Sequence, residues 1–149
     1  MSLRIFERWF NIEPWKNAEY ITDNHGEKFW TSWGTHFGLG PKLWVYYRGN
    51  WVATVESAWN NDGGLDLADI IIFERYQELR QRGIGKKMMK LFVEKAKHEG
   101  AKFIWGFISA HEGSTVEYLR EWYSRQGFDV FEAEPNIFHI LMNLEGGER

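Results

Sequence analysis

The chain has 149 residues, of which 44% are hydrophobic and 26% charged, a composition that fits one folded domain with a sizeable core. An aromatic content of 17% excludes a disordered, charge-rich chain, and the absence of cysteine excludes disulfides, thiolate metal sites and cysteine nucleophiles. A net charge of −3 argues against nucleic acid as the main partner, and no apolar run is long enough to span a membrane. With no secretory signal pattern, these features predict a cytoplasmic protein.

The charge is distributed unevenly along the chain. Residues 75–102 contain nine lysines and arginines against three acidic residues, so this segment carries +6 in a chain whose net charge is −3. A basic block within an acidic protein indicates a local binding site for an anion, but a solvated helix face has the same composition. Charge alone does not decide between these two interpretations.

The first part of the chain is rich in tryptophan: residues 1–59 contain seven of the nine. We expect a strand over 3–9, one or two short helices within 14–34, and a loop over 36–41, which contains two glycines and a proline. The simpler interpretation of the aromatic residues is packing in the core or in a homodimer. The alternative is an acceptor pocket for a cationic amine, lined by Trp15, Trp30, Trp33 and Trp44.

From residue 43 onward the pattern is regular. Two β-rich runs, 43–48 and 51–59, flank Gly49-Asn50, a composition typical of a tight hairpin. A second turn precedes a buried strand over 65–73. The order of elements from residue 43, β-β-β-α-β-α-β-β, predicts a mixed α/β (α+β) fold. The later elements are a helix over 84–96, a strand over 102–109, a helix that opens at a capping pattern at Ser114 and ends at Gly127, and strands over 128–131 and 137–142.

The segment between the buried strand and the first helix carries the strongest chemical signal. Gly83 and Gly85 allow main-chain amides to approach an anion, and the helix N-terminus adds positive potential. The spacing differs from a dinucleotide fingerprint, which needs glycine at Met88, and from a P-loop, which needs glycine at Arg80. We therefore predict a diphosphate cradle of another kind, with basic side chains from Arg80, Arg82, Lys86 and Lys87.

Two motifs at a defined distance indicate a family. Arg80-x-x-Gly83-x-Gly85 and, 38 residues later, Tyr123 followed by Gly127-Phe128 resemble the signature motifs of the GNAT superfamily of N-acetyltransferases. The resemblance implies a GNAT-like fold, with a central mixed, mostly antiparallel twisted sheet of about six or seven strands flanked by about four helices. It implies a single domain over 1–149, with a divergent N-terminal part (1–42) and an acetyl-CoA-binding core (43–143).

The resemblance also implies roles for individual residues. The loop would bind the pyrophosphate of acetyl-CoA, and the end of the preceding strand would bind the pantetheine arm, with a main-chain N–H near Ile72 or Phe73 polarising the thioester carbonyl. Val116 stands where the family often has an asparagine; either Ser114 or Thr115 replaces its hydrogen bond to the cofactor, or the contact is absent. Tyr123 would be the general acid. The implied cofactor-binding residues are Ile71, Ile72, Phe73, Arg80, Gln81, Arg82, Gly83, Ile84, Gly85, Lys86 and Ser114.

Several acidic residues are candidates for the general base. Glu74, just beyond the buried strand, is the first, and a solvated charge at a strand end is an equal interpretation of it. Glu56, Asp69 and His111 are further candidates. The histidines show no metal-ligand spacing, so no metal is expected.

Together these features predict an enzyme. The expected activity is acetyl-CoA-dependent N-acetylation of a primary amine of a small molecule or a peptide, by direct attack and with a tyrosine as general acid. The alternative is a module on the same fold that binds acyl-CoA or a protein partner without transferring the acyl group.

Overall fold

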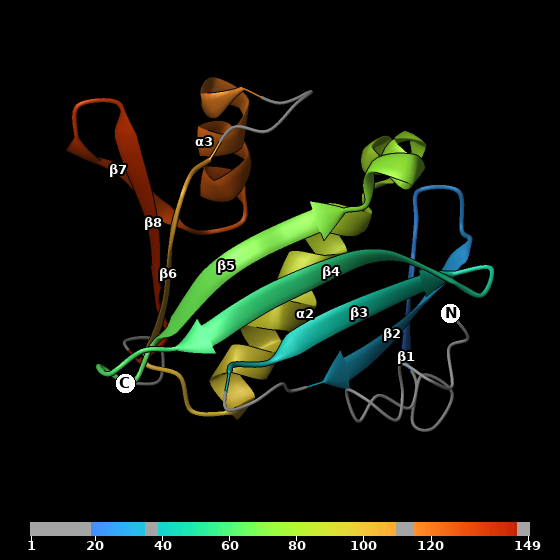
Figure 1. Cartoon of the computed structure of the whole chain (residues 1–149), viewed down its shortest axis with the longest axis horizontal. Helices are drawn as coiled ribbons and strands as arrows, with labels where there is room; N and C mark the ends of the chain where they lie inside the picture. Colours follow the sequence, from blue (N-terminus) through green and yellow to red (C-terminus); the bar gives the residue numbers. More distant parts are fainter. Residues whose placement is uncertain (1–18, 35–38, 110–114, 146–149) are drawn as a thin grey trace.

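Figure 1 shows the computed structural model, which describes residues 19–34, 39–109 and 115–145. Eight strands of this part form one sheet in the order β1-β2-β3-β4-β5-β6-β8-β7, in which β5 and β6 are parallel and all other neighbours antiparallel. The strands are β1 (Glu19–Thr22), β2 (Lys28–Gly34), β3 (Lys42–Tyr47), β4 (Asn50–Trp59), β5 (Leu65–Ile72), β6 (Phe103–Phe107), β7 (Asp129–Glu134) and β8 (Ile137–Asn143). The helices are the 3₁₀ helix η1 (Glu74–Arg82) and the α-helices α2 (Ile84–His98) and α3 (Val116–Arg125).

The main core lies between the sheet and α2, which crosses one face of it (Figure 1). Ile84, Met88 and Phe92 follow one another at four-residue intervals, form one stripe of α2 and are fully buried. They belong to one cluster with Leu43 and Val45 of β3. Burying a side chain of this size stabilises the fold by about 1.5–3 kcal/mol, so this stripe holds α2 against the sheet.

The parallel strands β5 and β6 separate soon after they meet, as Figure 1 shows. Their pairing covers only two positions, Leu65 with Ile104 and Asp66 with Trp105. A Cβ atom on Gly106 of β6 would lie 3.1 Å from the backbone oxygen of Leu67 in β5. The two backbones therefore approach closely just before they part. Beyond this point the edge of β5 that faces β6 has no strand paired to it within the described residues.

A β-bulge lies in β5 where the two strands diverge. The register pairs Glu56 of β4 with Asp69 and the next residue, Ser57, with Leu67, so Ala68 is an extra residue on β5. A bulge bends a strand and shifts its in–out alternation by one residue. The core-facing positions of β5 are accordingly Leu65, Leu67, Ile70 and Ile72.

The prediction of short helices within 14–34 is wrong for residues 19–34, which form the β1–β2 hairpin. Phe29 and Thr31 are buried while Lys28 and Trp30 are exposed, an alternation with the two-residue period of a strand. The turn between the strands contains Gly26 at φ +81. The expected strand over 3–9 lies outside the described residues.

From residue 43 onward the predicted order β-β-β-α-β-α-β-β is confirmed. The described part of the chain has eight strands and two α-helices instead of the expected six or seven strands and four helices. The additional element in this region is η1, which fills the connection between β5 and α2 and is anchored by the buried side chain of Leu79. None of the helices in the described ranges has the length and apolarity that crossing a membrane requires.

Replacing Phe92 with alanine tests the importance of the α2 stripe. Because Phe92 is fully buried, Phe92→Ala should lower the free energy of unfolding by about 3–5 kcal/mol. Lys90→Ala, an exposed position on the same helix, should change it by less than about 0.5 kcal/mol. Urea denaturation of the three proteins measures both effects, and equal stabilities would contradict this account of the core.

Candidate functional site

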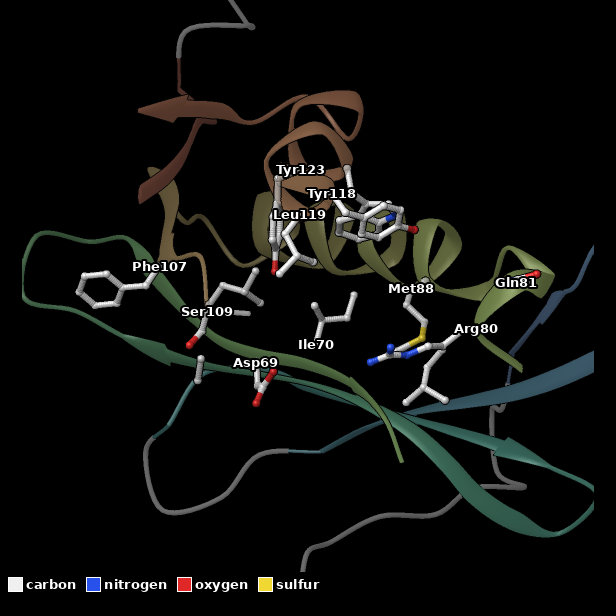
Figure 2. A pocket seen from close by; sticks show the side chains of 15 residues that line it. Asp69, Ile70, Arg80, Gln81, Met88, Phe107, Ser109, Tyr118, Leu119 and Tyr123 are labelled. Atoms are coloured by element: carbon white, nitrogen blue, oxygen red, sulfur yellow. The ribbon is translucent and has the colours of Figure 1, made fainter. Parts of the chain in front are cut away.

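The divergence of β5 and β6 opens a pocket of about 480 Å³. Its walls come from β5, from η1 and the start of α2, from the end of β6, and from α3. Figure 2 shows the side chains that line it, with those of α3 facing those of β5 across the space. The pocket therefore brings together the two motifs that lie far apart in the sequence.

The glycine-containing loop forms one side of the pocket. Gly83 adopts the left-handed conformation (φ +79, ψ 10) between η1 and α2, and no side chain caps the helix that starts at Ile84. The N-terminus of an α-helix carries a positive potential, because the amides of its first turn have no carbonyl partner within that helix, and it favours an anion. Gly85 and Arg80 line the pocket, and Figure 2 shows the Arg80 guanidinium extending into it while Gln81 lies at its edge.

Only part of the basic cluster of this loop is directed to the pocket. Arg80 and Lys86 are exposed. The Arg82 guanidinium instead contacts carboxylates of the β1–β2 turn, and Lys87 donates hydrogen bonds to the carbonyl and to the hydroxyl oxygen of Thr22. Two of the four basic side chains predicted to bind phosphate, Arg82 and Lys87, thus contact the β1–β2 hairpin instead.

Asp23 is the buried partner of Arg82. Its Oδ1 accepts hydrogen bonds from the amides of His25 and Glu27, both at 2.9 Å, and its Oδ2 lies 3.3 Å from Nη1 of Arg82. Burial disfavours the charged form, but the amide of Glu27, the amide of His25 and the arginine outweigh this effect. The pKa of Asp23 consequently lies below its usual value.

The second motif places Tyr123 in the pocket. Thr115 caps the N-terminus of helix α3, and its hydroxyl oxygen accepts a hydrogen bond from the amide of Tyr118 at 3.1 Å. Gly127, at φ +98, lets the chain turn back, so that the Phe128 ring packs edge-on against Tyr123 and its amide donates to the Tyr123 carbonyl. Figure 2 shows the Tyr123 hydroxyl pointing into the pocket.

The environment of Tyr123 keeps its hydroxyl protonated. The side chain is almost fully buried, and burial raises the pKa of Tyr123 to about 12, with the negative charge of Asp69 adding to the effect. A tyrosine with this pKa is a hydrogen-bond donor throughout the physiological pH range. The hydroxyl therefore carries a proton into the pocket at neutral pH.

The three residues predicted to bind the pantetheine arm have different environments in the structure. Ile72 lines the pocket, whereas Ile71 is not among the lining residues. The amide of Phe73 donates to the carbonyl of Val52 at 2.9 Å, and its side chain packs with Trp44. The N–H of Phe73 is therefore engaged in the sheet.

Among the base candidates, Asp69 lines the pocket. Glu56 instead forms an ion pair with Lys42 at 2.7 Å. The side chain of Glu74 lies outside the described residues, as do His111 and the predicted cofactor residue Ser114. No group of three histidine or acidic side chains gathers as a metal site in the part of the chain that the structure describes.

Of the tryptophans suggested for an acceptor pocket, Trp30, Trp33 and Trp44 are not among the residues that line this pocket. Trp44 is buried and packs against Trp51, with ring centroids 4.4 Å apart, and Trp30 packs edge-on against Tyr20. Trp15 lies outside the described residues. The described contacts favour the packing interpretation of these side chains.

Several pocket residues were missed by sequence reasoning. Met88, Leu119 and Trp122 line the pocket, and the four-residue spacing of Leu119 and Tyr123 in the sequence is a sign that these two share one face of a helix. The others that had not been singled out for the site are Leu67, Ala68, Ile70, Phe107, Ser109 and Tyr118.

Comparisons with known proteins agree with this geometry. The model of the acetyltransferase (GNAT) family matches residues 3–128. A search of curated protein sequences gives no match. Among solved structures, the GNAT domain of S. lividans PAT has a TM-score of 0.68 at 10% identity, covering 85% of this chain and 97% of that chain.

Two further solved structures are similar to this chain. The IAA acetyltransferase from Bacillus cereus has a TM-score of 0.57 at 19% identity, covering 70% of this chain and 78% of its own. A GNAT family acetyltransferase from Elizabethkingia anophelis with acetyl-CoA bound has a TM-score of 0.56 at 17% identity, covering 70% and 76%. At these identities the likeness shows the fold.

The ionised state of Asp23 should contribute to stability in a pH-dependent way. Because the folded pKa is lowered, the contribution is present above the unfolded pKa of about 3.9 and is lost as the pH falls through the folded pKa. The stability difference between the unchanged protein and Asp23→Asn should therefore be largest near neutral pH and shrink in acid. Thermal unfolding at several pH values measures it, with the exposed Asp129→Asn as control; a difference that grows in acid would contradict the assignment.

Proposed function

Because the chain belongs to the GNAT family of acetyltransferases, we propose that it transfers the acetyl group of acetyl-CoA to a primary amine of a small molecule or a peptide. The observation that carries this proposal is the pocket between the diverging strands. It has a helix N-terminus with Gly85 on one side and the buried Tyr123 hydroxyl on another. A homodimer and a cytoplasmic location stay predictions from the sequence.

The two ends of acetyl-CoA have matching surfaces in this pocket. The diphosphate binds at the first turn of α2, where the helix N-terminus and the exposed Arg80 supply positive potential. The pantetheine arm carries amide groups along an extended chain. It pairs with the edge of β5 that β6 leaves open beyond Asp66, as an added strand does.

The reaction requires two proton movements. The neutral amine attacks the thioester carbonyl, a C–N bond forms, and the C–S bond breaks as the Tyr123 hydroxyl gives its proton to the leaving thiolate. The carboxylate of Asp69 lines the pocket and takes the proton that the amine loses. Glu74 stays the alternative base predicted from the sequence.

A module that binds acyl-CoA without transferring the acyl group is the second candidate. One observation favours it: the N–H of Phe73, one of two amides expected to polarise the thioester carbonyl, is hydrogen-bonded to Val52. In an active enzyme another donor, such as the N–H near Ile72, has to serve this purpose.

Addition of coenzyme A tests both candidates. A ligand that binds only the folded state at about 100 times its Kd stabilises the protein by about 2.7 kcal/mol, so CoA should raise the melting temperature. Incubation with acetyl-CoA and panels of amines and peptides should then release free thiol. Stabilisation without thiol release supports the binding module, and no stabilisation by CoA contradicts the proposed function.

Tyr123→Phe separates binding from chemistry. Loss of the hydroxyl removes the general acid, so kcat should fall by about 10²-fold or more while the Kd for CoA changes less than about twofold. Tyr118→Phe is the matched control, because Tyr118 lines the same pocket but is about half exposed. Equal kcat values for the two variants would exclude Tyr123 as the acid.

The raised pKa of Tyr123 adds a pH test. Its proton should be retained up to pH values above about 10, where an ordinary tyrosine ionises, so kcat should not fall below that pH through loss of this proton. The contradicting result is a descending limb of the pH–kcat profile, centred well below pH 10, that the unchanged protein shows and Tyr123→Phe lacks. Such a limb would mean that Tyr123 loses its proton too early to be the general acid described here.

A further inference from the structure

The turn between β1 and β2 lies directly against the loop that precedes α2. The amide of Asn24 donates to the carbonyl of Arg82 at 2.8 Å, and Nδ2 of Asn24 lies 3.4 Å from the carbonyl oxygen of Gln81. A Cβ atom placed on Gly83 would lie 2.6 Å from Oδ1 of Asn24. The close approach of the turn thus depends on glycine at position 83, in addition to its positive φ.

The charged contacts of Arg82 add to this attachment. Its guanidinium lies 3.3 Å from Asp23, 3.8 Å from Glu27 and 3.5 Å from the Tyr47 hydroxyl. These partners are themselves held in place. Asp23 accepts hydrogen bonds from two amides of its own turn. Glu27 accepts a hydrogen bond from the Tyr47 hydroxyl, and its carboxylate lies 3.6 Å from the Arg48 guanidinium. The arginine therefore meets a network that is already ordered.

The hairpin also contacts the chain on the other side of Gly83. Lys87, in the first turns of α2, donates hydrogen bonds to the carbonyl and the hydroxyl oxygen of Thr22, the last residue of β1. Contacts at Arg82 and at Lys87 bracket the amides of the first helical turn. Their position relative to the sheet is consequently set by a segment about 60 residues earlier in the chain, since 59 residues separate Asp23 and Arg82.

From these contacts we propose that the β1–β2 turn is a positioning element for coenzyme binding, in which Asp23, through Arg82, together with Asn24 holds the diphosphate loop in its binding conformation. The inference rests on the proposed function, since it assumes that this loop binds CoA. Asp23 and Asn24 act through the loop and do not touch the coenzyme. A site that is ordered before the ligand arrives loses less conformational entropy on binding, so the turn increases affinity.

The assignment divides the basic block into two groups. Arg82 and Lys87 act as attachment points for the hairpin, and their charge or donor capacity is used within the protein. Arg80, whose guanidinium extends into the pocket, and Lys86 on the exposed side of α2 remain for the phosphates. Removal of Asp23 should therefore weaken CoA binding even though it removes a negative charge near an anion site, the opposite of the simple Coulomb expectation.

The test is calorimetric titration of CoA into the unchanged protein and into Asp23→Asn, well below the unfolding transition of both. We expect the Kd to rise by about threefold to tenfold, the range for a residue that modulates a site without contacting the ligand. Glu99→Gln, which removes a carboxylate paired with Lys95 at 3.2 Å at the far end of α2, is the matched control and should leave the Kd unchanged.

Two further readouts separate positioning from a general loss of stability. Amide hydrogen exchange should rise in Asp23→Asn at Ile84–Lys87 and stay unchanged in the β7–β8 hairpin. In the Arg82→Gln background, Asp23→Asn should have no additional effect on Kd, because Asp23 acts through Arg82. If Asp23→Asn does not fold, Glu27→Gln, at a more exposed acidic partner of Arg82, takes its place.

The outcomes distinguish this inference from the proposed function. If the unchanged protein does not bind CoA, the proposed function fails and the inference fails with it. If the unchanged protein binds CoA and the Kd of Asp23→Asn is the same or lower, only the inference is overturned. Additive effects of Asp23→Asn and Arg82→Gln, or a uniform rise in hydrogen exchange, would also overturn it.

Discussion

The separation of β5 from β6 is the constraint on which the rest of the molecule depends. Parallel strands gain their stability from continuous pairing, yet these two share only two paired positions before the bulge at Ala68 bends β5 away. The opening exposes apolar side chains and backbone groups that would be costly to leave unpartnered. Helix α2, which follows the glycine-containing loop, and helix α3, which carries Tyr123, line the opening. The same distortion that weakens the sheet therefore creates the pocket.

The sequence was most informative where a residue type has one physical explanation. Gly83 and Gly127 both have positive φ values, and each ends or begins a helix where the motif predicted it. Tyr123 lines the pocket from α3, and the turn at Gly127 brings Phe128 back to pack against its ring. The order of elements from residue 43 was predicted for the same reason, since hydrophobic periodicity and turn composition are local properties.

The features that sequence reasoning missed depend on contacts between distant segments. Residues 19–34 alternate in burial as strands do, but their aromatic and polar composition did not distinguish a hairpin from short helices. Arg80 and Arg82 are chemically identical in the sequence, and only the hairpin, which pairs with Arg82, gives them different environments. Asp69 was one of several acids within a strand pattern, and the bulge before it decides that it lines the pocket.

The open edge of β5 also limits what can bind to it. An unpaired strand edge ordinarily invites another polypeptide strand, which is a common origin of aggregation. Here the edge lies at the pocket that α2 and α3 help to line, with Leu119 and Trp122 among the lining side chains. A polypeptide strand carries side chains on both faces, and it would have to bring them into this pocket before it could pair with the edge. The open edge of β5 thus keeps its hydrogen-bonding capacity inside a pocket lined by two helices, where an ordinary edge strand would present it on an open surface.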